Sequence, residues 1–250
     1  MTTTESKPEA AAETPKKEED YKIELLPEDY PQYDLSFKLI FIGDSSVGKS
    51  CLTTKAVKNN FEEYYQATVG FEFLTFNMKV NDKVIKLQIW DTCGQETYRS
   101  LIHGFYRNSS LAILVYSIDN LKSFEDLGIW INVIKTNTSP DVKIFLIGNK
   151  SDLNESREVP KEKAEQFVKD NELKLFLESS AKTGLNINRL FAEAANFLYE
   201  EYLQVLKTQE ISDSIPIEKD NAQSNINEVE DESSIYLNSK RRKKNKCCGA

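Results

Sequence analysis

The chain has 250 residues, of which 40% are hydrophobic and 29% charged, and its formal net charge is −8. No stretch approaches the ~18 uninterrupted apolar residues of a transmembrane helix, and the N-terminus lacks the apolar run of a secretory signal. The four cysteines, Cys51, Cys93, Cys247 and Cys248, do not form a disulfide framework, which fits a reducing compartment.

Uneven charge marks the domain boundaries that we predict. Residues 1–34 contain 10 acidic and 4 basic residues, and residues 209–232 contain 8 acidic residues and 1 basic residue. Residues 233–250 contain 6 basic residues and no acidic ones. Segments this charged bury little apolar surface. We therefore expect one folded domain at 35–208 between a disordered acidic extension, 1–34, and a disordered tail, 209–250.

Strand and helix patterns alternate within the predicted domain, as a mostly parallel sheet with helices on both faces requires. The strands are expected at 37–42, 72–80, 84–90, 111–118, 143–148 and 174–177. Asn81 and Asp82 predict a hairpin turn between the second and third of these. Pro160 is typical of a first helical turn, and Asn186 is a plausible cap for the last helix.

The loop after the first predicted strand has the pattern G-x-x-x-x-G-K-S, from Gly43 to Ser50. Its glycines let backbone N–H groups converge on phosphate oxygens, and the helix that follows adds the positive end of its dipole. Lys49 is expected to reach the β- and γ-phosphates, and the Ser50 hydroxyl to bind Mg²⁺. The alternative is that the loop is a simple glycine turn between a strand and a helix. The further motifs described below argue against it.

A second phosphate-proximal motif runs from Trp90 to Glu96 at the end of an apolar strand. There Asp91 can hold Mg²⁺ opposite Ser50, directly or through water. Gly94 offers a backbone N–H to the γ-phosphate, and Gln95 can orient an attacking water. Lys49 and Gln95 are therefore the predicted catalytic residues.

Base recognition is predicted from Asn149-Lys-Ser-Asp152, at the end of another strand. The Asp152 carboxylate can accept two N–H bonds from the guanine edge, which adenine does not offer, so the site should discriminate strongly. The stem of Lys150 can lie along the purine. Ser179-Ser-Ala-Lys182, after the last strand, can contact the guanine O6 through backbone N–H groups.

Together these motifs resemble the small GTPases of the Ras superfamily, specifically the Rab family, over roughly residues 36–207. The resemblance implies a P-loop NTPase G domain with a six-stranded, mostly parallel α/β sheet. It makes Thr68 the switch threonine that meets Mg²⁺ and the γ-phosphate, and it places Tyr64 and Tyr65 near the ribose and base. It also makes Phe73, Trp90 and Phe105 an aromatic triad that effectors read.

The predicted site combines these motifs with the positions that the resemblance adds. Mg²⁺ is the expected cofactor, held by Ser50, Thr68 and Asp91, with GTP as substrate and GDP as product. The nucleotide contacts are expected to be Asp44, Ser45, Ser46, Val47, Gly48, Lys49, Ser50, Cys51, Tyr65, Thr68, Asp91, Gly94, Asn149, Lys150, Asp152, Leu153, Ser180, Ala181 and Lys182.

Some positions depart from the family pattern. Cys93 replaces the usual alanine beside the switch glycine, Thr97 replaces an arginine, and Ser117 replaces an aspartate. The single histidine, His103, is interpreted as a surface residue.

The sequence leaves two candidate functions. One is a cycling GTPase switch in vesicle-mediated transport; the other is a membrane-tethered GTP-binding module that hardly hydrolyses GTP because of Cys93. A P-loop kinase is a distant third.

The C-terminus carries a basic run from Lys240 to Lys246 before Cys247 and Cys248. The paired cysteines resemble the Rab signal for two geranylgeranyl groups; farnesylation of Cys247 alone and a nuclear signal are the alternatives. We expect the cytoplasmic face of an endomembrane or vesicle, with a cytosolic pool. The expected partners are an exchange factor, a GTPase-activating protein, effectors, and prenylation and membrane-extraction chaperones; no nucleic acid is expected.

Overall fold

The computed structural model describes residues 23–61, 71–92 and 106–214, with side chains up to residue 208. One sheet contains seven strands in the order β1-β3-β4-β2-β5-β6-β7. Its strands are β1 (Ile23–Leu26), β2 (Leu35–Ile42), β3 (Phe71–Val80), β4 (Lys83–Thr92), β5 (Leu111–Ser117), β6 (Lys143–Asn149) and β7 (Leu175–Glu178).

Five strands run parallel to one another, and β3 is antiparallel to both β1 and β4. Asn81 turns the β3–β4 hairpin with a φ of 54°, in the left-handed region that asparagine tolerates. The predictions of a mostly parallel sheet and of this hairpin are confirmed. The predicted number of six strands is one too few, because β1 adds an edge strand.

The additional strand β1 lies in the segment that we expected to be disordered. It pairs with β3 in a register that places Ile23 opposite Val80 and Leu26 opposite Asn77. The buried Asn77 amide also donates to the carbonyl groups of Pro27, at 2.9 Å, and Glu28, at 2.8 Å. Part of the acidic extension is therefore structured and covers the edge of β3.

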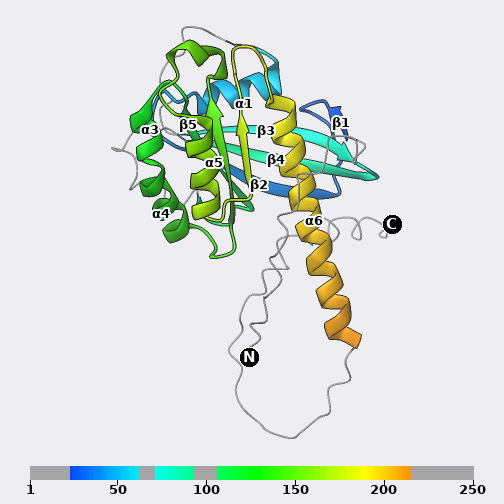
Figure 1. The fold of residues 1–250 in the computed structure, drawn as a ribbon. Helices are drawn as coiled ribbons and strands as arrows, with labels where there is room; N and C mark the ends of the chain where they lie inside the picture. Colours follow the sequence, from blue (N-terminus) through cyan, green and yellow to red (C-terminus); the bar gives the residue numbers. More distant parts are fainter. Residues whose placement is uncertain (1–22, 62–70, 93–105, 215–250) are drawn as a thin grey trace, which may run out of the picture.

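Helices cover both faces of the sheet (Figure 1). The helices α1 (Lys49–Lys58) and α6 (Ile187–Ser214) pack on one face. The other face carries α3 (Leu121–Glu125), α4 (Leu127–Asn137) and α5 (Lys161–Asp170). Figure 1 shows the end of α6 extending beyond the sheet, and α6 continues past the domain boundary predicted at residue 208. None of the helices in the described part of the chain is both long and apolar enough to cross a membrane.

The alternation of β2 explains why both faces are covered. Leu39 and Phe41 belong to the core beneath α1 and α6, whereas Ile40 and Ile42 belong to the core beneath α3, α4 and α5. All four side chains are fully buried. Since each fully buried aliphatic or aromatic side chain contributes about 1.5–3 kcal/mol, a strand that is apolar on both faces requires two helical layers.

Two predicted helix starts differ in detail. Pro160 stands just before α5, where its carbonyl accepts the N–H of Lys163 at 3.1 Å, so it is the cap residue and not a first-turn residue. Asn186 precedes α6 as predicted, but its side chain donates to the carbonyl of Glu178 at 2.7 Å. Asn186 therefore ties the helix start to the end of β7.

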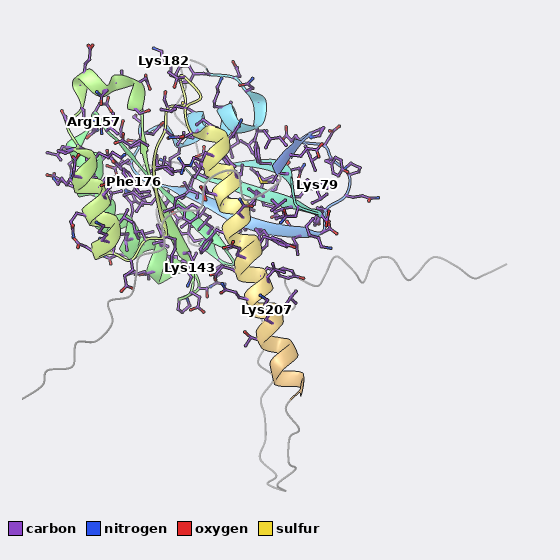
Figure 2. The ribbon with its side chains drawn as sticks, turned by 45° about the vertical axis from the view of Figure 1, so that its right-hand side comes forward. Lys79, Lys143, Arg157, Phe176, Lys182 and Lys207 are labelled. Carbon is purple, nitrogen blue, oxygen red and sulfur yellow. The ribbon has the colours of Figure 1, made fainter. Side chains whose placement is uncertain are left out.

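The carboxyl ends of the parallel strands point to the same end of the molecule. Lys143, the first residue of β6, lies at the opposite end of the sheet from Lys182, which follows β7 (Figure 2). The loops after β2, β4, β5, β6 and β7 therefore meet at one edge. In open α/β sheets, ligands bind in the crevice at this edge.

Candidate nucleotide-binding site

The phosphate loop joins β2 to α1 through two glycines at which any larger residue would make a close contact. A Cβ at Gly43 would lie 2.2 Å from the carbonyl oxygen of Val115, and one at Gly48 would lie 2.4 Å from Nδ2 of Asn149. Gly48 also has a φ of 93°, a conformation that glycine adopts without strain. The loop is therefore held close to β5 on one side and to β6 on the other.

Lys49 begins α1, and its ammonium lies over the loop. Its Nζ donates to the carbonyl oxygens of Gly43, at 2.9 Å, and Asp44, at 2.6 Å. The side chain is 5% exposed. The helix N-terminus and this cation together make the loop an anion-binding site.

Ser50 and Asp91 form a buried pair on neighbouring elements, α1 and β4. The Ser50 hydroxyl donates to Oδ2 of Asp91, while Oδ1 of Asp91 is buried and has no hydrogen-bond partner among the residues that the structure describes. Burial raises the pKa of Asp91 from 3.8 to about 6, against the opposing effects of the Ser50 hydrogen bond and the Lys49 charge.

The donor set of this pair fits Mg²⁺. A buried carboxylate oxygen without a partner is unfavourable unless a cation or a donor binds it. Mg²⁺ prefers oxygen ligands and is often held by one or two protein side chains together with substrate phosphates. Ser50 and Asp91 are therefore suited to hold the ion; the third predicted ligand, Thr68, lies outside the described residues.

Asn149 connects the phosphate loop with the loops predicted to bind the base. Its Nδ2 donates to the carbonyl of Val47 at 2.9 Å. Its Oδ1 accepts from the N–H of Ala181 at 3.3 Å and from the hydroxyl of Ser179 at 3.4 Å. The side chain is 1% exposed. One buried amide thus fixes three segments that are far apart in the sequence.

The two predicted base-recognition motifs form one surface. The Ser180 hydroxyl donates to Oδ1 of Asp152 at 2.5 Å, and the Ser151 N–H donates to the carbonyl of Ser179 at 2.9 Å. Lys150 has a φ of 64°, and its Nζ lies 3.7 Å from Oδ1 of Asp119. These contacts place an exposed carboxylate and a lysine stem beside the Ser180–Lys182 loop.

Ser117, where the resemblance leads one to expect an aspartate, belongs to the same surface. It is buried at the end of β5, and its hydroxyl donates to Oδ1 of Asp119. Asp119 in turn faces Lys150. The carboxylate at this part of the surface therefore comes from Asp119, two residues after the position where the resemblance leads one to expect it.

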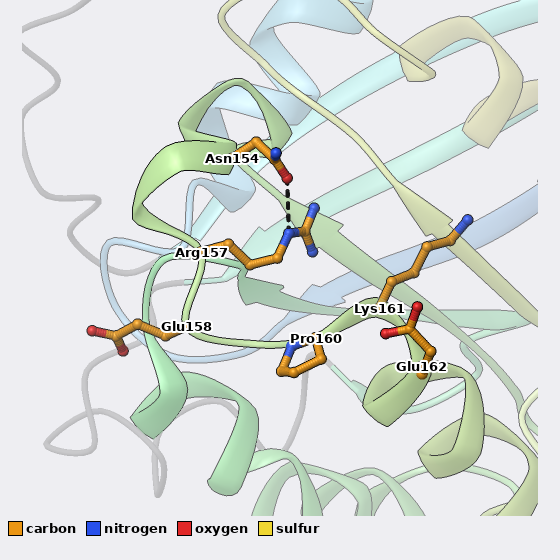
Figure 3. A pocket seen from close by; sticks show the side chains of 6 residues that line it. All are labelled: Asn154, Arg157, Glu158, Pro160, Lys161 and Glu162. Carbon is orange, nitrogen blue, oxygen red and sulfur yellow. Dashed lines mark hydrogen bonds between the residues drawn. The ribbon is translucent and has the colours of Figure 1, made fainter.

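Sequence reasoning missed the ion pair that joins the two base loops. The Arg157 guanidinium donates to both carboxylate oxygens of Glu178, at 2.6 and 2.9 Å, and its Nε donates to Oδ1 of Asn154 at 2.9 Å (Figure 3). Asn154 lies in the short 3₁₀ helix η3 (Ser151–Ser156), which also contains Asp152, and Glu178 directly precedes Ser179. Arg157 therefore connects the two loops through its contacts with Asn154 and Glu178.

An open hollow of about 400 Å³ lies beside Arg157, and Figure 3 shows the side chains that line it. It is lined by Asn154, Arg157, Glu158, Pro160, Lys161 and Glu162, none of which we predicted to bind the nucleotide. The hollow therefore shares no lining residue with the predicted site.

Two members of the predicted aromatic triad lie together on β3 and β4. The rings of Phe73 and Trp90 meet edge to face with centroids 5.4 Å apart. Phe71, which was not predicted, stacks on Trp90 at 5.4 Å, and Phe71 and Phe73 are 43% and 47% exposed. The ammonium of Lys38 lies 4.5 Å from the Trp90 ring centroid. The third predicted member, Phe105, lies outside the described residues.

Several other predictions also fall outside the described residues. These concern the ribose-side tyrosines, the switch residues, the single histidine and the C-terminal basic and cysteine residues. They are Tyr64, Tyr65, Cys93, Gly94, Gln95, Thr97, His103, residues 240–246, Cys247 and Cys248.

A sequence model of the Ras family matches residues 38–200. The match covers more than half of the chain and includes the phosphate loop, Asp91 and both base loops.

Proposed function

The chain belongs to the Ras family of small GTPases, and we propose that it is a Rab-like switch that hydrolyses GTP and recruits effectors at a membrane surface. The observation that carries the nucleotide assignment is the placement of Asn149. Its amide contacts the phosphate loop through Val47 and the base loop through Ala181, so one nucleotide can span both.

The chemistry that the residues support is phosphoryl transfer from GTP to water. Lys49 and the N–H groups of the loop would stabilise negative charge on the phosphates. Ser50 and Asp91 would hold Mg²⁺, which would neutralise part of that charge. Gln95, which we predicted to orient the attacking water, retains that role as a proposal.

Guanine selectivity rests on Asp152. The Ser180 hydroxyl donates to one oxygen of this carboxylate and so restricts its orientation. Guanine offers an N1–H and a 2-amino group to such an acceptor, whereas adenine offers no matching pair. The unpaired carboxylate penalises ATP by on the order of 10⁴-fold or more.

Competition against labelled GDP tests the assignment. Unlabelled GTP and GDP are expected to displace the label, and ATP is not. Asp152→Asn is expected to shift preference toward xanthine nucleotides, because an amide can donate to the carbonyl that xanthine presents. Asp82→Asn, in the exposed β3–β4 turn, is the matched control. Equal competition by ATP and GTP would overturn the guanine assignment.

The second candidate is a GTP-binding module with little turnover, which is favoured by Cys93 beside the switch glycine. A single-turnover assay of γ-phosphate release, with Cys93→Ala beside the wild type, separates the two. A slow wild type that Cys93→Ala accelerates would favour the binding module. Equal rates would favour the cycling switch.

The Rab-type role and the membrane attachment are also part of the proposal. The exposed Phe71 and Phe73 around Trp90 support an effector surface, and the paired terminal cysteines after a basic run support double prenylation. We propose the cytoplasmic face of an endomembrane or vesicle as its location. The partners would be an exchange factor, an activating protein, effectors, and prenylation and extraction chaperones.

A further inference from the structure

Asp44 places a carboxylate in the second position of the anion-binding loop. Its backbone carbonyl accepts the ammonium of Lys49 at 2.6 Å, so the residue is part of the phosphate loop itself. A carboxylate turned toward the bound phosphates would repel them, and burial from water would strengthen the repulsion. The direction of the Asp44 side chain therefore matters for affinity.

Trp130 contacts that carboxylate directly. Its indole Nε1 donates to Oδ1 of Asp44 at 2.7 Å, across 86 residues of sequence. The indole is 2% exposed and belongs to the core beneath α4. An indole N–H can only donate, so the contact orients the carboxylate toward α4.

The support beneath this contact is rigid. Trp130 belongs to α4. It is buried against β5 together with three other residues of the same helix, Leu127, Ile131 and Ile134. The phosphate loop rests on the same strand, since Gly43 directly contacts Val115. The donor and the acceptor are therefore held by one strand, β5.

We propose that Trp130 is a positioning residue that holds the Asp44 carboxylate away from the phosphates and so permits tight binding of guanine di- and triphosphates. This inference rests on the proposed function. It assigns to Trp130 an electrostatic role in nucleotide retention beyond its packing in the core.

Release of labelled GDP from the Mg²⁺-loaded full chain tests the proposal. Trp130→Phe keeps an aromatic ring in the core and removes the N–H. We expect release to become about tenfold faster, the effect of losing one hydrogen bond to a charged group. Ile134→Val is the matched control, since it removes one methylene from the same core and is expected to release GDP at the wild-type rate.

Charge neutralisation distinguishes positioning from packing. Asp44→Asn removes the charge, so adding Trp130→Phe to Asp44→Asn is expected to change release less than twofold relative to Asp44→Asn alone. A purely structural role of Trp130 would not respond to this neutralisation.

Two outcomes would overturn the inference. One is wild-type release by Trp130→Phe, and the other is an equally large acceleration by Trp130→Phe in the Asp44→Asn background. Failure of the proposed function has a different signature. In that case the wild type itself would fail to retain guanine nucleotide, or would retain ATP equally well.

Discussion

Asp91 shows a conflict between stability and metal binding at a single residue. Its carboxylate is fully buried, and burial raises its pKa from 3.8 to about 6. The Asp91 carboxyl group therefore binds its proton more tightly in the folded chain than in the unfolded chain. As pH rises from about 4 to about 6, the metal-free fold loses stability, and the full penalty is present above pH 6.

We expect Asp91→Asn to stabilise the metal-free protein at pH 7.5 by on the order of 2–3 kcal/mol, because it removes a buried charge. Urea unfolding in chelator measures this difference, which should diminish at pH 5. Added Mg²⁺ should stabilise the wild type but not the variant. Asp82→Asn serves as the exposed control. A wild type at least as stable as Asp91→Asn at pH 7.5 would contradict the prediction.

Gly48 provides a steric prediction at the same scale. Gly48→Ala would place a Cβ 2.4 Å from Nδ2 of Asn149, in a backbone conformation that strains alanine. We expect faster release of bound GDP, because Asn149 must move from the carbonyl of Val47. Gly128→Ala is the control, since nothing lies within 4 Å of a Cβ there. If both variants release GDP at the same rate, the contact does not hold the loop.

Sequence reasoning placed the site residues whose chemistry depends on spacing along the chain. Lys49, Ser50 and Asp152 were predicted because a phosphate loop and a guanine edge require those side chains at those positions. Trp130 and Arg157 were not, since their contacts with Asp44 and Glu178 depend on how separate elements pack. No local pattern encodes that packing.

At the scale of elements, the six predicted strands are present, with ends that differ by at most a few residues. Long apolar runs such as 37–42 are reliable signals because burial on both faces leaves few alternatives. β1 was missed because the prediction for residues 1–34 was made from the composition of the whole acidic segment, which conceals the short run Ile-Glu-Leu-Leu. Its strand pairing depends on the edge of β3, which composition alone does not reveal.

β1 and the turn after it should stabilise the β3–β4 hairpin. Removing residues 1–30 would eliminate the pairing with β3 and both carbonyl acceptors of the Asn77 amide. We expect a loss of about 1–3 kcal/mol in unfolding free energy and faster amide exchange in β3. Removing only residues 1–22 is the matched control and should change neither. Equal stability of the two truncations would show that β1 contributes nothing.

At the scale of the molecule, the chain combines a nearly neutral domain with an acidic N-terminal extension and a tail that is acidic at 209–232 and basic at 233–250. β1 forms one edge of the sheet, and the end of α6 extends beyond the sheet (Figure 1). The basic run and the paired cysteines follow α6 in the sequence. Membrane attachment is therefore expected to depend on the last residues of the chain and not on the sheet.

Replacing both Cys247 and Cys248 with serine should release the protein to the cytosol, whereas neutralising the six basic residues of 240–246 should only weaken or redirect attachment. Two prenyl chains bind membranes stably, while a basic patch without lipid is screened by salt. Fractionation of cells expressing each variant measures this difference, and intact mass counts two, one or no prenyl groups. Replacing only Cys248 separates double geranylgeranylation from a single lipid on Cys247. An unlipidated chain that still sediments with membranes in high salt would contradict the prediction. It would also remove the main support for the proposed role in vesicle transport.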